Sequence, residues 1–311
     1  MRRPAVILIS LICLLLLLPA CAGKAPESGK LKAVASAFPE YDLLRAVGGQ
    51  DVEITLLLKP GMEAHTYEPT PQGILAIRSG ALFVYGGGES DVWADRLLAA
   101  GDLGDVRVLA FMDHALLRQE ETQDYMTVEE AEEAGDEYDE HVWTSPRNAI
   151  LLAEALRDTL SELDPEHAGD YRANAESYIA QLEALDGEFR ELAQGSKRDL
   201  LVVGDRFPFL YLVREYGLRY AAAFPGCSDE TEANPATVAK LIDTVKEEGI
   251  PVVFKCDLSA GKLAGTIAEA AGAKVGTLYS AHTLSKADFE AGETYLSLMD
   301  RNLAALREAL N

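Results

Sequence analysis

The stretch PEHAGDYRANAESYIAQLEALDGEFRELA, from Pro165 to Ala193, organises the rest of the chain. Its apolar residues recur at the three- and four-residue spacing of one helix face, and they include Tyr171, Ala175, Tyr178, Ile179, Leu182 and Leu185. The pattern predicts one helix from Pro165 to about Ala193, which is unusually long for an α/β protein. A helix of this length can join two halves of a chain as a rigid connector.

Short apolar runs that predict strands alternate with helical patterns on both sides of this helix. Before it, the predicted strands are Leu31–Phe38, Val52–Leu58, Ala81–Tyr85 and Arg107–Met112. After it, they are Asp199–Val203, Arg219–Phe224, Ile250–Lys255 and Lys274–Tyr279. Strands that are apolar throughout are typical of parallel sheets covered by helices on both faces. We therefore expect an α/β protein with two lobes, each a roughly four-stranded parallel sheet with flanking helices, and a cleft between them.

Most of the expected helices have proline near their first residue or glycine just after their last. In the first lobe they are Pro39–Val47, Pro71–Ser79, Asp91–Ala100 and Pro146–Leu163. In the second lobe they are Pro208–Tyr216, Pro235–Glu248, Ser259–Ala271 and Ala287–Leu310. The expected boundaries are therefore residues 31–163 for the N-terminal lobe, 164–196 for the connecting helix and 197–311 for the C-terminal lobe.

The N-terminus has the pattern of a signal peptide. Arg2 and Arg3 precede an apolar run, Val6–Leu18, that is short for a membrane span. The run leads into LPAC, which ends at Cys21 and resembles the lipobox at which bacterial lipoproteins are cut and lipidated. We expect residues 1–20 to be the signal peptide, Cys21 to carry the lipid, and residues 21–30 to tether the protein to the outer face of the cell membrane. Ordinary secretion with Cys21 unmodified is the alternative.

The chain is strongly acidic, with a formal net charge of −23 over 311 residues. This charge excludes nucleic acid as a partner, because nucleic-acid-binding proteins need a basic surface to neutralise phosphate. It suits cations and keeps a soluble protein dispersed. The acidic segment from Glu120 to Glu140 could gather cations weakly, but we expect it to be a solvated surface segment.

Several side chains that can bind a metal follow predicted strands, where the ligands of open parallel sheets gather. They are His65, His141, Asp205 and His282. Each has an ordinary structural explanation as well, since a loop histidine is usually surface and an aspartate before a helix is usually a cap. Neutral imidazoles with a carboxylate are a preferred zinc shell, so their shared placement predicts a metal site closed between the lobes. The remaining histidines, His114 and His167, are expected to be solvated.

Two cysteines remain after Cys13 in the signal peptide and Cys21 at the anchor. In an exported domain Cys227 and Cys256 could form a disulfide, stay as buried free thiols, or ligate a metal as thiolates. The sequence leaves these three alternatives open.

Motifs of nucleophilic catalysis and of nucleotide binding are absent from the sequence. It contains no GxSxG, no GxxxxGK[ST], no HExxH and no CxxC. Gly86-Gly87-Gly88 follows a predicted strand but lacks the GxGxxG spacing of a dinucleotide-binding loop. We therefore do not expect an enzyme, and any metal ligands must converge from distant parts of the chain.

Longer phrases of the sequence resemble the metal-specific solute-binding lipoproteins of bacterial zinc and manganese ABC transporters. The matching phrases are SAFPEYDLLRAVGG, LLLKPGMEAHTYEPTP, ALFVYGGGESDVWADRLL, DEHVWTSPRNA, YLVREYGL and AGETYLSLMDRNL. They occur in family order from near Leu31 to the C-terminus, so the resemblance covers nearly all of the mature chain. It implies two α/β lobes, a long rigid helix, and one cation bound between the lobes.

The resemblance also implies a set of metal ligands. His65 matches the first family histidine and His141 the second, with Trp143 and Pro146 as its neighbours. The third family ligand aligns on Gly204, which has no side chain, so we expect Asp205 to replace it. The fourth family ligand is often an aspartate in a phrase similar to YTDS, which here is YSAH, so His282 takes that role.

The expected function is that of a lipid-anchored, monomeric receptor that captures one divalent transition metal and delivers it to an ABC permease. Three imidazoles and one carboxylate favour zinc (Zn²⁺) over manganese (Mn²⁺), which prefers more oxygen ligands. A manganese receptor of the same family is one alternative. A zinc hydrolase of the cell envelope, which would need a vacant coordination position, and an adhesin of this fold are others.

Overall fold

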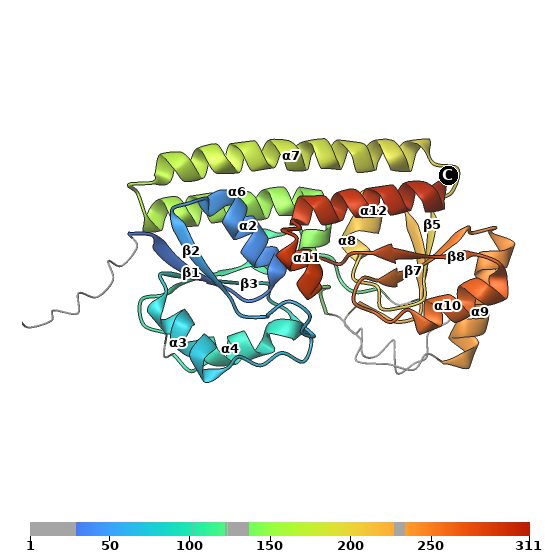
Figure 1. Ribbon diagram of the computed structural model, residues 1–311, viewed down its shortest axis with the longest axis horizontal. Coiled ribbons are helices and arrows are strands. Elements are labelled where there is room, and N and C mark those ends of the chain that lie inside the picture. Colours follow the sequence, from blue (N-terminus) through green and yellow to red (C-terminus); the bar gives the residue numbers. More distant parts are fainter. Residues whose placement is uncertain (1–28, 102, 122, 124–136, 227–233) are drawn as a thin grey trace, which may run out of the picture. The chain divides into compact units, whose positions relative to one another are not determined.

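The computed structural model describes residues 29–101, 103–121, 123, 137–226 and 234–311 (Figure 1). The expected signal peptide, Cys21, Cys227 and most of the acidic segment lie outside the described residues. The chain divides into two compact units, Met1–Lys30 and Leu31–Asn311, and the second contains all the elements described below. Within the described ranges, no helix combines the length and the apolar character that crossing a membrane requires.

The second unit contains two four-stranded sheets, and each is parallel throughout. The first has the order β2-β1-β3-β4, formed by Val52–Leu56, Leu31–Ala35, Leu82–Tyr85 and Arg107–Ala110. The second has the order β6-β5-β7-β8, formed by Arg219–Ala222, Leu200–Val203, Val252–Cys256 and Lys274–Leu278. The expected fold class is therefore confirmed. In each sheet the strand order reverses between the first and third strands, which is where α/β proteins bind ligands.

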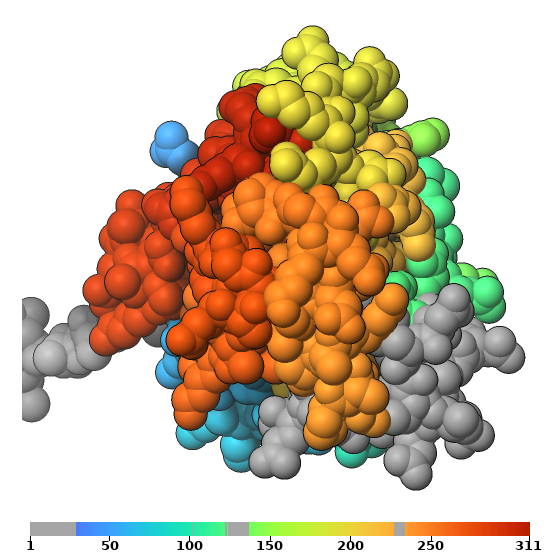
Figure 2. Space-filling model, turned by 90° about the vertical axis from the view of Figure 1, so that its right-hand side faces the viewer, coloured from blue at the N-terminus to red at the C-terminus, as the bar shows by residue number. Residues whose placement is uncertain are grey.

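Helices surround both sheets (Figure 1). In the first half they are α2 (Phe38–Gly48), α3 (Pro71–Ser79), α4 (Val92–Ala99) and α6 (Pro146–Leu163), with short 3₁₀ turns η1 (Glu89–Asp91), η2 (Phe111–His114) and η3 (Val142–Thr144). In the second half they are α8 (Leu210–Glu215), α9 (Pro235–Glu247), α10 (Lys262–Ala271), α11 (Lys286–Glu290) and α12 (Tyr295–Leu310). Orange segments, which include α9 and α10, fill the centre of the face in Figure 2.

A glycine explains two of the differences between the expected and the observed helices. The terminal helix expected from Ala287 is divided into α11 and α12, because Gly292 has a φ of +79° and the Thr294 side chain caps a new helix start. The helix expected from Ser259 begins at Lys262, since Gly261 at its N-cap has a φ of +67°. In both cases a glycine in the left-handed region interrupts an otherwise helical pattern.

The long helix α7 spans Ala168–Gly195 and runs along both halves (Figure 1). It packs against α2 and α6 of the first half and against α12 of the second. Its buried face consists of Tyr171, Ala175, Tyr178, Leu182, Leu185, Phe189 and Leu192. These residues belong to one hydrophobic cluster that contains core residues from both sheets. The two halves therefore share a continuous core rather than a flexible linker.

We expect Leu182→Ala to lower the free energy of unfolding by about 2–5 kcal/mol, because it leaves a cavity in the shared core. Urea denaturation followed by fluorescence and by circular dichroism should give one coincident transition for the whole unit. Gln181→Ala, at the exposed neighbouring position, is the matched control and should change stability little. Separate transitions for the two halves would contradict a shared core.

Candidate metal centre

A cavity of about 490 Å³ lies between the two halves of the second unit. His65 from the loop after β2 and His141 from the turn before η3 line it from the first half. Gly204 and Cys256, at the ends of β5 and β7, line it from the second half together with His282, which follows β8. The cavity therefore adjoins the carboxyl ends of strands, where ligand sites of open parallel sheets form.

One group of described side chains has the geometry to hold a metal ion. It consists of His65, Glu140, His141 and His282, and one candidate ligand atom from each lies within 4.8 Å of the others. The three imidazole centroids are 5.4–5.9 Å apart. Ligands of a tetrahedral zinc ion at about 2 Å lie about 3.3 Å from one another, so shifts of about one ångström would close this group around an ion.

His65 presents a nitrogen without a hydrogen-bond partner. Its Nε2 is buried and unpaired, and lies 3.7 Å from Glu140 Oε1. Its Nδ1 lies 2.9 Å from Glu63 Oε1 and 3.3 Å from Arg206 Nη1. The hydrogen bond with His65 is the main reason why the pKa of Glu63 falls to about 2. A carboxylate on Nδ1 orients the ring and leaves Nε2 for a metal.

His141 is fully buried and is fixed by Asp139. The Asp139 Oδ1 atom accepts from the His141 backbone nitrogen at 2.7 Å and lies 3.0 Å from its Nδ1. Burial lowers the pKa of His141, but the charge and hydrogen bond of Asp139 outweigh it and raise this pKa above its ordinary value. Tyr211 Oη donates to the Asp139 carbonyl at 2.6 Å, which ties this turn to α8 in the other half. The arrangement leaves Nε2 as the available ligand atom of His141.

His282 is buried among aromatic rings. Its ring centroid lies 4.9 Å from that of Trp143, and its Nδ1 is buried without a hydrogen-bond partner. Burial, followed by the positive charges that His141 and His65 would carry, lowers the pKa of His282 well below its ordinary value. The ring is therefore neutral near physiological pH, which is the form that binds metals. Ala281, just before it, has a φ of +56°, which is rare for a residue with a side chain.

Glu140 is the member of the group that the sequence analysis missed. Ser90 holds its carboxylate through the backbone nitrogen at 2.8 Å and through Oγ. Gly88 permits this approach, since a Cβ there would lie 2.5 Å from Glu140 Cβ. The expectation of a solvated acidic segment is wrong for Asp139 and Glu140, which are both 1% exposed. Two features of the sequence could have indicated the role of Glu140. It directly precedes His141, and three glycines follow β3.

Asp205, predicted as a ligand, lines the cavity but does not belong to the group. Its two carboxylate oxygens accept from the backbone nitrogens of Arg206 at 3.0 Å and Cys256 at 3.1 Å. Gly204 beside it has no room for a side chain, because a Cβ would lie 2.5 Å from Ala264 Cα in α10. Helix α10 therefore occupies the space in which a ligand from position 204 would stand.

The remaining candidates lie apart from this group. His114 is exposed, and the half-buried His167 pairs with Asp164 at 2.7 Å. Cys256 carries a free thiol whose Sγ donates to the Arg206 carbonyl. Burial raises the pKa of this thiol well above its ordinary value, which disfavours the thiolate that a metal needs.

Two buried carboxyl groups, those of Asp91 and Glu40, interact electrostatically with Glu140. Asp91 Oδ2 accepts from the backbone nitrogens of Gly86 at 2.8 Å and Gly87 at 3.2 Å. Burial, helped by the charge of Glu140, raises the pKa of Asp91 to about 7. Burial, helped by the charge of Asp91, raises the pKa of Glu40 to about 8. These groups therefore hold protons at pH values where exposed carboxyls are ionised.

Glu40 should make the stability of the metal-free protein fall as pH rises. Its pKa is higher in the folded than in the unfolded state, so its contribution is present below pH 4.5 and is lost as pH rises to about 8. We expect Glu40→Gln, which keeps an acceptor for the Ala37 nitrogen, to become progressively more stable than the wild type over this range. The difference should reach at most about 5 kcal/mol, since each unit of pKa change corresponds to about 1.4 kcal/mol.

Urea denaturation at several pH values measures this difference. Glu269→Gln, on the exposed surface of α10, is the control and should leave the pH profile unchanged. A constant difference between Glu40→Gln and the wild type would contradict the buried, protonated carboxyl.

Comparisons with known proteins identify relatives of this chain. A family model described as "Zinc-uptake complex component A periplasmic" matches residues 33–309. The zinc-binding lipoprotein AdcA of Streptococcus pneumoniae is 33% identical over 99% of this chain, which spans 61% of that relative's length. The high-affinity zinc uptake system protein ZnuA of Bacillus subtilis is 29% identical, with 95% of this chain and 94% of that protein covered.

A solved structure has the same fold. It is the Zn(II)-bound ZnuA-like domain of Streptococcus pneumoniae AdcA, which matches with a TM-score of 0.76 and 32% identity. The match covers 91% of this chain and 99% of that domain.

Proposed function

The chain belongs to the zinc-uptake complex component A family, and we propose that it is an exported receptor that captures one zinc ion and delivers it to an ABC permease. The observation that carries the proposal is the convergence of three imidazoles and one carboxylate, each supplying a ligand atom within 4.8 Å of the rest. Two of these histidines have buried nitrogens without a hydrogen-bond partner, which a metal would satisfy.

The proposed zinc ligands are His65, Glu140, His141 and His282. Glu140 replaces Asp205, whose two oxygens are already engaged by backbone amides. Glu63 and Asp139 support the first two histidines through their Nδ1 atoms, an arrangement that is usual around metal sites. Three imidazoles favour zinc over manganese, because manganese prefers oxygen ligands.

This ligand set supports binding rather than catalysis. Four protein ligands complete the tetrahedral shell of zinc, whereas a hydrolase keeps one position for water. The relatives and the solved structure are described as zinc-binding or zinc-uptake proteins, which supports a transport receptor over an envelope hydrolase. Attachment of a lipid at Cys21, the outer face of the cell membrane as the location, and a monomeric state remain part of the proposal.

His141→Ala should remove zinc from the protein. The purified unit 31–311 should contain about one zinc ion per chain in the wild type and little in the variant, as measured by elemental mass spectrometry. His114→Ala, which changes an exposed histidine outside the group, should retain the ion. Equal zinc content in all three proteins would overturn the proposed function.

The choice between Glu140 and Asp205 can be tested with isosteric variants. Glu140→Gln should weaken zinc affinity at least about 10-fold, because an amide is a poor zinc ligand. Asp205→Asn should change affinity much less, since its carboxylate binds backbone amides rather than the ion. Isothermal titration with competing chelators gives both affinities, and thermal melts check that both variants fold. The reverse order of effects would restore Asp205 as the ligand.

A further inference from the structure

The two neighbours of His65 Nδ1 require opposite hydrogen-bonding roles from this atom. Glu63 Oε1 lies 2.9 Å from it, and Arg206 Nη1 lies 3.3 Å from it. The pKa of Glu63 is about 2, so at neutral pH its ionised carboxylate can only accept a hydrogen bond. A guanidinium has donors and no acceptor. Because one nitrogen cannot donate to Glu63 and accept from Arg206 at the same time, the two contacts exclude each other.

Each contact selects a different tautomer of the His65 ring. A neutral imidazole carries one proton, either on Nδ1 or on Nε2, and its partners decide which. When Nδ1 donates to Glu63, Nε2 has a free lone pair and can bind a metal. When Nδ1 accepts from Arg206, the proton lies on Nε2, which faces Glu140 Oε1 at 3.7 Å and cannot bind a metal. Arg206 therefore competes with zinc for His65.

The charges around the ring favour the proton on Nε2 in the absence of metal. The side chain of Glu140 is 2% exposed, so little water screens its attraction for a proton on Nε2. The side chain of Glu63 is 56% exposed, so water screens its attraction for a proton on Nδ1. Arg206 weakens this attraction further, because its Nη1 also lies 3.5 Å from Glu63 Oε1.

The backbone of Arg206 is held just after β5 by contacts that do not involve its side chain. Its amide donates to Asp205 Oδ1 at 3.0 Å, and its carbonyl accepts from Cys256 Sγ at 3.4 Å. Asp205 Oδ2 also accepts from the Cys256 amide, which joins β5 to β7 at this point. From this position in the second half, the Arg206 side chain lines the cavity and reaches His65 in the first half.

We propose that Arg206 is a positioning residue that acts through His65 and lowers the affinity of the site for zinc. This inference rests on the proposed zinc-binding function. In the metal-free protein Arg206 donates to Nδ1 and keeps the proton on Nε2. When zinc binds, Nε2 loses its proton to water, Nδ1 takes one up from water and donates it to Glu63, and Arg206 gives up its contact. A receptor must also release its ion, and this competing donor makes release easier without removing a ligand.

Nuclear magnetic resonance of the metal-free unit 31–311 measures the tautomer of His65 directly. With isotope-labelled histidine, the chemical shifts of the ring nitrogens show which of them carries the proton, and His65→Ala identifies the signals of this residue. The measurement is made at a pH of about 8.5, where an ordinary imidazole is neutral. We expect the proton on Nε2 in the wild type and on Nδ1 in Arg206→Met, which keeps a long side chain but has no donor.

Arg206→Met should also bind zinc at least about 10-fold more tightly than the wild type and release it more slowly. This is the factor that one hydrogen bond from a charged donor typically contributes. Titration of zinc against competing chelators gives the affinities, and transfer of zinc to an excess of chelator gives the release rates. Thermal melts of the metal-free proteins check that the variant folds.

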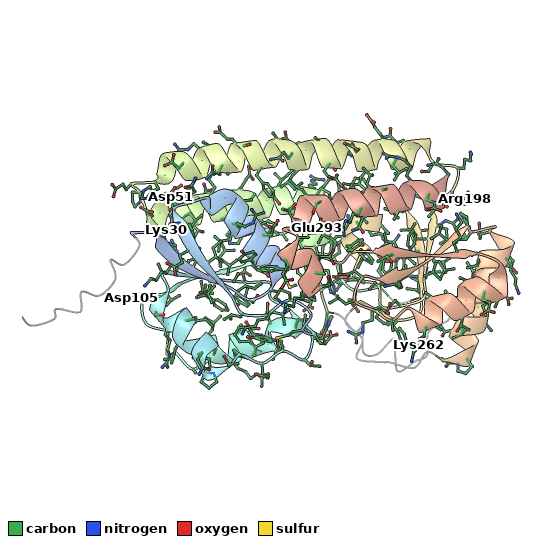
Figure 3. All side chains as sticks on the ribbon, viewed as in Figure 1. Lys30, Asp51, Asp105, Arg198, Lys262 and Glu293 are labelled. Atoms are coloured by element: carbon green, nitrogen blue, oxygen red, sulfur yellow. The ribbon has the colours of Figure 1, made fainter. Side chains whose placement is uncertain are left out.

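Lys262→Met is the matched control for the loss of a positive charge. Lys262 lines the same cavity from the start of α10, is exposed, and lies on the side of the second half away from α7 (Figure 3). It makes no hydrogen bond with His65 in the part of the chain that the structure describes. The variant should therefore keep the tautomer of His65 and a zinc affinity close to that of the wild type.

The outcomes separate this inference from the proposed function. The same His65 tautomer in Arg206→Met and the wild type, or zinc binding by Arg206→Met that is no tighter, would overturn the inference and leave the zinc receptor intact. Equal gains of affinity in Arg206→Met and Lys262→Met would also overturn it, because they would show an effect of charge alone. Absence of zinc binding from every protein would overturn both.

Discussion

The apolar face of α7 is the constraint on which the rest of the structure depends. Its buried residues pack against helices of both halves and unite the two sheets in one core. A core packed at the density of protein interiors deforms little, so it fixes the positions of the strand ends of the two halves relative to one another. This relation brings His65 and His141 from before α7 to within 6 Å, between ring centroids, of His282 from after it.

Hydrogen bonds between the halves then position the backbone around the histidines with the precision that metal coordination requires. Trp143 Nε1 donates to the Ser280 carbonyl at 2.8 Å, and Phe38 donates its amide to the His282 carbonyl at 3.3 Å. Tyr295 Oη donates to the Trp143 carbonyl at 2.7 Å. Each bond joins a residue of one half to a histidine of the other half, or to a residue two positions from a histidine. Buried bonds of this kind are costly to break, because they leave polar groups unpaired.

The sequence predicts the features that local patterns determine, but it does not predict those that depend on contacts between residues far apart in the chain. Eight strands and α7 follow from periodicity, and the three histidines follow from strand ends and from family phrases. Glu140 could not be separated from its acidic neighbours, because its burial depends on Ser90 and Gly88, about fifty residues earlier in the chain. Asp205 had the expected place after a strand, but its oxygens are taken by two backbone amides. The break between α11 and α12 was not predicted, because it depends on the backbone angle of Gly292.

Gly204 links the metal centre to the neighbouring cavity. Because it has no side chain, α10 can approach to within contact of β5, and the start of α10 then borders the cavity. The carboxylate of the proposed shell comes instead from Glu140, which lies in the first half with His65 and His141. Three of the four proposed ligands therefore move with the elements before α7, and only His282 belongs to the second half. In the loop that carries His282, Ala281 has a φ of +56°, a strained conformation for a residue with a side chain.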